Sequence, residues 1–210
     1  MLEIKETRIE DIKNVQKLWA NGDVMKFVGF PDGLHKTDED MQKWFRWIES
    51  NRTVLNHYSI FEDGKYCGES FYAIDAGHKS AAMDIKLFEL ARGRGIATEG
   101  LSYAIKEAFR NGAEIVWVDP NPENKNAIAL YERLGFQQKE FPKILISYDE
   151  ELRSIYLELC KTDFIQKSQF VKSGSAGTTI KDGFIHQVFI VGGCHLVALI
   201  VMVLVSNILY

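Results

Sequence analysis

The most informative stretch of this chain is Leu90-Ala91-Arg92-Gly93-Arg94-Gly95-Ile96-Ala97-Thr98. It lies between a predicted strand, Met83 to Phe88, and a predicted helix, Ile96 to Phe109. Glycines allow a tight turn that brings backbone N–H groups close to a ligand, and the first N–H groups of a helix lack an internal partner. Together with the helix dipole they predict a phosphate site. Taken alone, these residues also fit a glycine-rich turn without a ligand.

A second informative stretch follows one predicted helix and one predicted strand later. It reads Asn124-Lys125-Asn126-Ala127-Ile128-Ala129-Leu130-Tyr131-Glu132-Arg133-Leu134-Gly135-Phe136. It resembles N-x-x-A-x-x-L-Y-x-x-x-G-F, the second motif of the GNAT acetyltransferases. Arg92-x-x-Gly95-x-Ala97 resembles the R/Q-x-x-G-x-G/A signature of that family, in which the loop holds the pyrophosphate of acetyl-CoA. The resemblance extends over roughly residues 1–164 and is closest to the ribosomal-protein-alanine acetyltransferase branch, which also acts on small amines.

The expected fold is a mixed α/β (α+β) arrangement. Changes in hydrophobic period predict the order strand, two helices, three strands, helix, strand, helix, two strands. The strands are expected at Leu2–Arg8, Val54–Phe61, Tyr66–Ile74, Met83–Phe88 and Glu114–Val118, with two more within Phe136–Tyr148 and Arg153–Leu159. The resemblance implies the GNAT fold, a mostly antiparallel sheet that splays near acetyl-CoA, with helices on both faces.

The resemblance also implies a reaction and a cofactor site. Acetyl-CoA would donate its acetyl group to a primary amine, on a small molecule or a protein N-terminus, by direct attack in a ternary complex. The residues expected to bind acetyl-CoA are Arg92, Gly93, Arg94, Gly95, Ile96, Ala97, Thr98 and Asn124. Tyr131 matches the tyrosine near the thioester sulfur, where its hydroxyl can protonate the leaving thiolate. Without the resemblance, Tyr131 reads as a core tyrosine on an amphipathic helix.

Two carboxylates are candidates for the base that accepts the ammonium proton. Glu69 lies in a predicted strand, and Asp84 lies on the strand that leads into the glycine turn. In the family that strand lines the acetyl site and bulges where its N–H groups receive the thioester carbonyl. The sequence does not choose between the carboxylates, and alignment of the reactants alone also accelerates such reactions.

Composition narrows the partners and the compartment. The net charge of −4 gives no positive field to collect nucleic acid, so no nucleic-acid partner is expected. The three cysteines are far apart, which argues against disulfides and against a zinc site, and no metal is expected. A reducing, cytoplasmic location follows. The histidines His35, His57 and His78 fit no nucleophile–base pattern and are interpreted as surface or structural residues.

Two rival functions stay open at this point. Gly93-x-Gly95 opens a helix after a strand, and Asp119 ends the next strand, as in a nicotinamide-dependent oxidoreductase. Thr98, however, stands at the third glycine position, and the turn follows apparently antiparallel strands. The second rival is a GNAT-like module that binds CoA without catalysis.

The predicted organisation is a GNAT domain at residues 1–165, a linker at 166–187 and a hydrophobic segment at 188–210. The last 23 residues from Val188 carry no charge unless His195 is protonated, and as a helix they are long enough to cross a bilayer. Three interpretations remain open for this segment: a membrane anchor with the enzyme on the cytoplasmic side, an element buried in a homodimer, or an extension foreign to the native protein.

Overall fold

The computed structural model describes residues 1–140, 142 and 155–165. In this part of the chain one sheet has the order β1-β2-β3-β4-β5-β7-β6. The strands are β1 Leu2–Glu6, β2 Leu55–Glu62, β3 Lys65–Asp75, β4 Ser80–Leu87, β5 Ile115–Val118, β6 Gln137–Gln138 and β7 Leu157–Cys160. All neighbours are antiparallel except β4 and β5, which are parallel. The mixed, mostly antiparallel sheet is confirmed, and it is not the doubly wound sheet of a nicotinamide enzyme.

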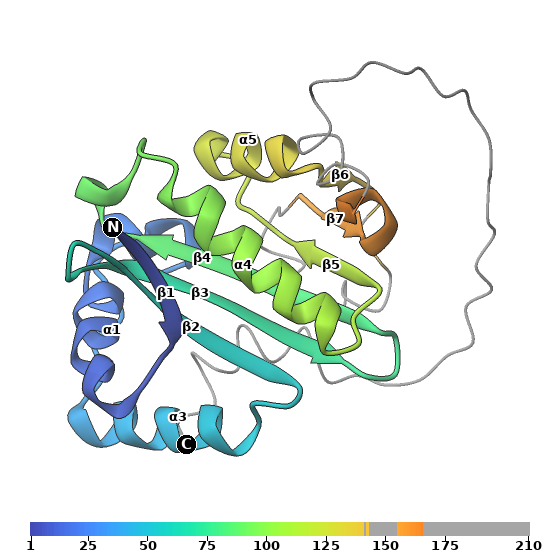
Figure 1. The fold of residues 1–210 in the computed structure, drawn as a ribbon. Coiled ribbons are helices and arrows are strands. Elements are labelled where there is room, and N and C mark those ends of the chain that lie inside the picture. The colour runs from blue at the N-terminus through green and yellow to red at the C-terminus, as the bar shows by residue number, and fades with distance from the viewer. Residues whose placement is uncertain (141, 143–154, 166–210) are drawn as a thin grey trace, which may run out of the picture.

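Helices cover both faces of the sheet, as expected. They include α1 Ile12–Trp19, α2 Gly22–Met25, α3 Asp38–Ser50, α4 Ile96–Arg110 and α5 Lys125–Leu134. Short 3-10 segments lie at Ile9–Asp11, Lys26–Val28 and Glu89–Ala91, and residues 161–165 after β7 are also helical. In Figure 1, α4 crosses one face of the sheet, whereas α1 and α3 lie against the other. We call the second face the α1 face; it includes His57, Glu69, Phe71, Asp84 and Lys86 of β2, β3 and β4.

Local sequence signals set the ends of several elements. The Thr37 side chain accepts the N–H of Asp40, whose carboxylate accepts the N–H of Thr37, so a capping box begins α3. Gly135 ends α5 with a φ of 104°, a left-handed conformation that favours glycine. Asp63 and Gly64 both have positive φ at the tip of the β2–β3 hairpin.

The sheet opens between β4 and β5. The two strands pair only at Ser80–Ala82 of β4, although β4 continues for five more residues. The carbonyl of Lys79 accepts the N–H of Glu114, so the odd-numbered residues of β4 turn their backbone groups toward β5. Past the last pair, the backbone groups that face the opening belong to Met83, Ile85 and Leu87. The predicted splay is therefore confirmed.

Three details differ from the sequence-based expectation. The register between β3 and β4 is continuous from Gly68 opposite Leu87 to Asp75 opposite Ser80, so the bulge expected on β4 was wrong. The register shift lies instead between β2 and β3, at Cys67. The loop after α1 contains the unpredicted helix α2, which is only four residues long. Within Phe136–Tyr148 a strand was expected. Among the residues of that range that the structure describes, only the two-residue strand β6 is present.

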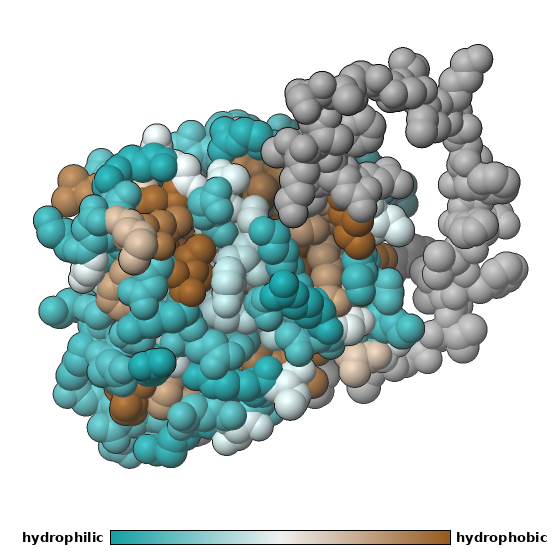
Figure 2. Space-filling model, viewed as in Figure 1, coloured by the Kyte–Doolittle hydropathy of each residue, from teal (hydrophilic) through white to brown (hydrophobic). Residues whose placement is uncertain are grey.

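The surface and the C-terminal segments complete the description. The face in Figure 2 is mostly hydrophilic, with apolar side chains in separate small areas. No helix among the described residues is both long enough and apolar enough to span a bilayer. The predicted linker 166–187 and hydrophobic segment 188–210 lie outside those residues, so the three interpretations of that segment remain predictions.

Candidate active site

The glycine turn presents the N-terminus of α4 beside the end of β4. Gly93 and Gly95 have φ values of 73° and 80°, which non-glycine residues rarely adopt, and Gly95 is the N-cap of α4. A Cβ added to either glycine would meet no atom within 4 Å. The turn is therefore open to solvent at both glycines, and the backbone N–H groups of Gly93 to Thr98 are candidates to hold a phosphate.

The two arginines of the turn have partners within the protein. The Arg92 guanidinium donates to the carbonyl of Leu87 at 3.1 and 3.2 Å and to that of Asp23 at 3.3 Å. It thereby joins the glycine turn to the end of β4 and to α2. Arg94 forms an ion pair of 2.5 Å with Glu62 at the end of β2. Both arginines therefore hold the turn in place, a role that the motif alone did not indicate.

Asn124 also has a structural role. It is the N-cap of α5, and its side-chain oxygen accepts the N–H of Ala127 at 3.2 Å. This is the usual function of asparagine at the start of a helix. The bond fixes the first turn of the helix that carries Tyr131.

Tyr131 is buried on α5, with 6% of its surface exposed, and its ring centroid lies 5.6 Å from that of Phe136. Burial, and then the charges of Asp84 and Asp119, raise the pKa of the Tyr131 hydroxyl well above its usual range. The hydroxyl is therefore protonated throughout the neutral pH range. Asp84 lies on the part of β4 beyond its last pair with β5, and α5, which carries Tyr131, follows β5 in the chain.

Glu69 lies deep in the α1 face, and only 3% of it is exposed. Its carboxylate accepts two hydrogen bonds from the Trp19 indole, at 2.9 and 3.1 Å, and lies 3.1 Å from Nε2 of His57 and 3.4 Å from Nζ of Lys86. Burial alone would raise its pKa, but His57 and Lys86, with the Trp19 hydrogen bond, lower the pKa of Glu69 to about 2. A carboxylate so engaged is a poor proton acceptor.

Asp84 is less enclosed, and its side chain is 21% exposed. One carboxylate oxygen accepts the N–H of Ile85 at 2.7 Å, and the other forms an ion pair with Lys86. The Lys86 ammonium thus lies between Asp84 and Glu69 on the same face. Burial disfavours its charge, but the two carboxylates outweigh burial and raise the pKa of Lys86.

A hydrogen-bonded row of side chains continues from Glu69 toward β1. The His57 ring bonds Glu69 through Nε2, and its Nδ1 lies 2.7 Å from the Thr7 hydroxyl, which lies 2.7 Å from that of Ser59. His57 also packs edge-on against Trp44 at 4.8 Å. The structural interpretation of His57 was correct, but its link to Glu69, and the roles of Trp19 and Lys86, were missed. Each link joins residues from separate strands or helices, so only the register of the sheet could have shown it.

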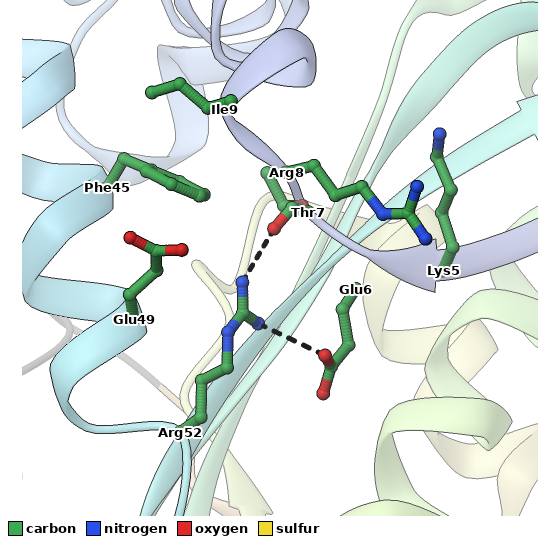
Figure 3. A pocket seen from close by; sticks show the side chains of 8 residues that line it. All are labelled: Lys5, Glu6, Thr7, Arg8, Ile9, Phe45, Glu49 and Arg52. Carbon is green, nitrogen blue, oxygen red and sulfur yellow. Dashed lines mark hydrogen bonds and ion pairs between the residues drawn. The ribbon is translucent and has the colours of Figure 1, made fainter.

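The cavity in Figure 3 is a separate feature. It has a volume of about 450 Å³ and is lined by the end of β1, α3 and Arg52. Its three cations are each ion-paired, Lys5 with Asp11 at 3.6 Å, Arg8 with Glu10 at 3.8 Å and Arg52 with Glu6 at 3.9 Å. Strands β2 and β3 separate it from β4. It is therefore not the opening beside Asp84, and its three cations are already paired with carboxylates.

Metal chemistry has no support in the described part of the chain. No group of three or more His, Cys, Asp or Glu side chains there could hold a metal ion. The expectation that no metal takes part in the reaction stays a prediction.

Comparison with known proteins places this geometry in context. Residues 2–137 match the sequence model of a family described as "Acetyltransferase (GNAT) domain". An uncharacterized N-acetyltransferase of Methanocaldococcus jannaschii is 48% identical over 123 residues, which are 55% of this chain and 53% of that protein. The chain thus spans about half the length of this relative.

Solved structures show the same fold at low sequence identity. The spermidine N-acetyltransferase of Vibrio cholerae, in complex with CoA and spermine, matches with a TM-score of 0.66 and 16% identity, over 78% of this chain and 98% of that one. A ribosomal-protein-alanine N-acetyltransferase of Brucella melitensis matches with a TM-score of 0.59 and 18% identity, over 75% and 99% of the two chains.

Proposed function

The chain belongs to the GNAT acetyltransferase domain family, and from this premise we propose that it transfers the acetyl group of acetyl-CoA to a primary amine. The observation that carries the proposal is the opening of the sheet beside β4. The N-terminus of α4 lies at one end of this opening, Asp84 lies on the unpaired part of β4, and the buried Tyr131 lies on α5, which follows β5. Attack of an amine on the thioester needs a bound acetyl-CoA, an acid for the leaving thiolate and a base for the ammonium proton. The phosphate site, the protonated hydroxyl and the partly exposed carboxylate match these three needs in turn.

We assign the pyrophosphate of acetyl-CoA to the turn from Gly93 to Thr98. The open space above Gly93 and Gly95 supports this assignment, because a phosphate needs the room that a Cβ would fill. Arg92, Arg94 and Asn124 would contribute mainly by fixing the turn and α5, since their side chains already bond protein groups. Any contact that they make with acetyl-CoA would be additional.

We assign the base to Asp84 rather than to Glu69. Asp84 is partly exposed at the opening, whereas Glu69 is buried and bonded by three side chains. In the reaction Asp84 accepts one proton from the ammonium group and exposes the nitrogen lone pair. The new C–N bond then forms as the C–S bond breaks, and the proton on Asp84 passes to water.

Tyr131 then acts on the leaving thiolate. Its hydroxyl donates a proton to sulfur, and the second proton released by nitrogen restores the hydroxyl through solvent. Because the negative charge of Asp84 helps to raise the pKa of Tyr131, protonation of Asp84 makes Tyr131 a stronger acid. The two groups are therefore coupled in the direction that the reaction needs.

The acceptor is a small-molecule amine or a protein N-terminus. The structural relatives named above act on both kinds of amine, and we propose no narrower class. We also propose that the catalytic unit is residues 1–165, followed by a linker at 166–187 and the hydrophobic segment 188–210, and that the enzyme works on the cytoplasmic side. Fractionation of cells that express the full chain tests its location.

The activity is tested with the full-length protein. Calorimetric titration measures the binding of acetyl-CoA and of NAD, and thiol release is followed with spermidine and with a peptide that has a free N-terminal alanine. We expect acetyl-CoA alone to bind and one thiol to appear for each amide formed. Binding of acetyl-CoA without turnover on any primary amine would support the non-catalytic module instead.

A further inference from the structure

The α1 face holds two carboxylates with one ammonium group between them. Lys86 forms an ion pair with Asp84 on its own strand and lies 3.4 Å from Glu69 on β3, directly opposite it in the register. The Lys86 side chain is 13% exposed, and that of Glu69 is 4% exposed. The arrangement therefore places a cation where solvent is largely excluded.

Without this cation the two carboxylates would repel each other. Like charges in a partly buried site disfavour double ionisation, so one member of such a pair holds a proton more tightly. The more exposed Asp84 would be affected directly, because it must be ionised to accept a proton from the substrate. Lys86 offsets the charge of Glu69, and its ion pair with Asp84, together with the Ile85 N–H, holds that carboxylate in one orientation.

We propose that Lys86 is a positioning residue that keeps Asp84 ionised and oriented at the opening of the sheet, and that Glu69 acts through Lys86. The proposal rests on the assignment of Asp84 as the base. Under this proposal the buried Glu69 holds Lys86 in place, and Trp19 and His57 hold Glu69 in place through their hydrogen bonds.

The other charged groups around this cluster come from several elements. Strand β2 contributes His57, which touches Glu69; α5 contributes Tyr131; and Asp119 follows β5, where its charge acts on Tyr131. Helix α1 contributes only the indole of Trp19, because its Lys13 and Lys17 are exposed to solvent. The Arg92 guanidinium lies at the carbonyl of Leu87, at the end of β4. Lys86 is thus the cation that contacts both carboxylates.

The test compares Lys86→Met, Lys86→Arg and Glu69→Gln in the full-length protein, with Lys106→Met on the exposed side of α4 as the control. The first measurement is the dependence of kcat/KM on pH, with the faster of the two acceptors above. The second is carboxyl ¹³C NMR of the free protein, which follows the Asp84 signal against pH and needs no acceptor.

Opposite shifts are expected for the two charge-removing variants. Lys86→Met should move the acidic limb of the kcat/KM profile, and the titration of the Asp84 signal, to higher pH, because the cation that favours the ionised carboxylate is gone. Glu69→Gln should move both to lower pH, because Lys86 then compensates Asp84 alone. Lys86→Arg should restore the native limb, and Lys106→Met should change neither.

The proposal is overturned if Lys86→Met lowers kcat/KM equally at every pH and leaves the NMR titration in place, as a merely structural role would. If Lys86→Met does not fold, the same two measurements on Glu69→Gln test the proposal. The proposal is overturned if the acidic limb of the kcat/KM profile of Glu69→Gln does not move. Failure of the base assignment is distinct. In that case Asp84→Asn would keep the acidic limb, which would then belong to another group.

Discussion

The indole nitrogen of Trp19 on α1 donates a hydrogen bond of 2.9 Å to Oε1 of Glu69 on β3. This bond joins the first helix to the centre of the sheet through a carboxylate that is almost fully buried. It explains why one of two carboxylates that look alike in the sequence is a structural anion. The other, Asp84, remains accessible at the opening.

Glu69 makes stability depend on pH at the acid end. Folding lowers the pKa of Glu69 from 4.5 to about 2, so the unfolded chain takes up the proton more readily. Its stabilising contribution is complete above pH 4.5 and is lost as pH falls toward 2. Integrated over that shift, the free energy of unfolding should fall by about 3 kcal/mol. Urea unfolding at a series of pH values should show this loss in the native protein and a smaller one in Glu69→Gln. The exposed Glu99→Gln is the control, and an equal loss in all three proteins would refute the role of Glu69.

Tyr131→Phe removes the hydroxyl and keeps the ring packed against Phe136. We expect kcat to fall by about a hundredfold, the usual contribution of a positioned acid, and the affinity for acetyl-CoA to change less than about twofold. Tyr103→Phe on α4, whose ring packs on Tyr58, is the matched control and should retain full activity. A fully active Tyr131→Phe protein would remove this hydroxyl from the mechanism.

Gly95→Val should abolish tight binding of acetyl-CoA, because the side chain would fill the open space at the N-terminus of α4. The positive φ also costs stability, about 1–2 kcal/mol. Gly64→Val separates the two effects: Gly64 has a φ of 75° with no atom near its Cβ position, but it lies in the β2–β3 hairpin. Calorimetry should show at least a tenfold loss of affinity for Gly95→Val and none for Gly64→Val. Equal affinities would end the assignment of the turn.

The sequence could predict those parts of the fold that short-range signals determine. The capping box at Thr37, the hairpin at Asp63 and Gly64 and the left-handed Gly135 each depend on a few adjacent residues. The turn at Gly93 and Gly95 and the position of Tyr131 followed in the same way from motifs. Helix α2 was missed because four residues carry too little periodicity to be seen.

The charge cluster could not be predicted, for a physical reason. Glu69 meets Ser59 on one side and Lys86 on the other only because of the register of three strands. A one-residue slip would turn each side chain to the opposite face. The choice between Glu69 and Asp84 therefore needed the sheet. The role of Arg92 likewise depended on where β4 and α2 come together.

Gly68 and Gly100 both lie where another chain segment approaches closely. The atom nearest to an added Cβ differs between them, so we expect substitution by alanine to have different effects on stability at the two positions. A Cβ on Gly68 would lie 2.0 Å from the carbonyl oxygen of Lys86, a backbone atom that cannot move without separating β3 from β4. A Cβ on Gly100 would lie 2.4 Å from Cδ1 of Ile60, the free end of a flexible side chain. Gly68→Ala should therefore lower the free energy of unfolding by about 3 kcal/mol or more, and it should also weaken catalysis because it shifts Lys86.

Gly100→Ala should change stability by less than about 1 kcal/mol, since the helix propensity gained in α4 offsets the displacement of Ile60. Ile60→Val removes the obstructing methyl group, so the double variant Gly100→Ala/Ile60→Val should be more stable than the sum of the single changes predicts. Denaturant unfolding of the four proteins measures this coupling. A Gly68→Ala protein as stable as Gly100→Ala would show that β3 and β4 can separate at Gly68. The backbone would then not require the close approach that aligns Lys86 with Glu69.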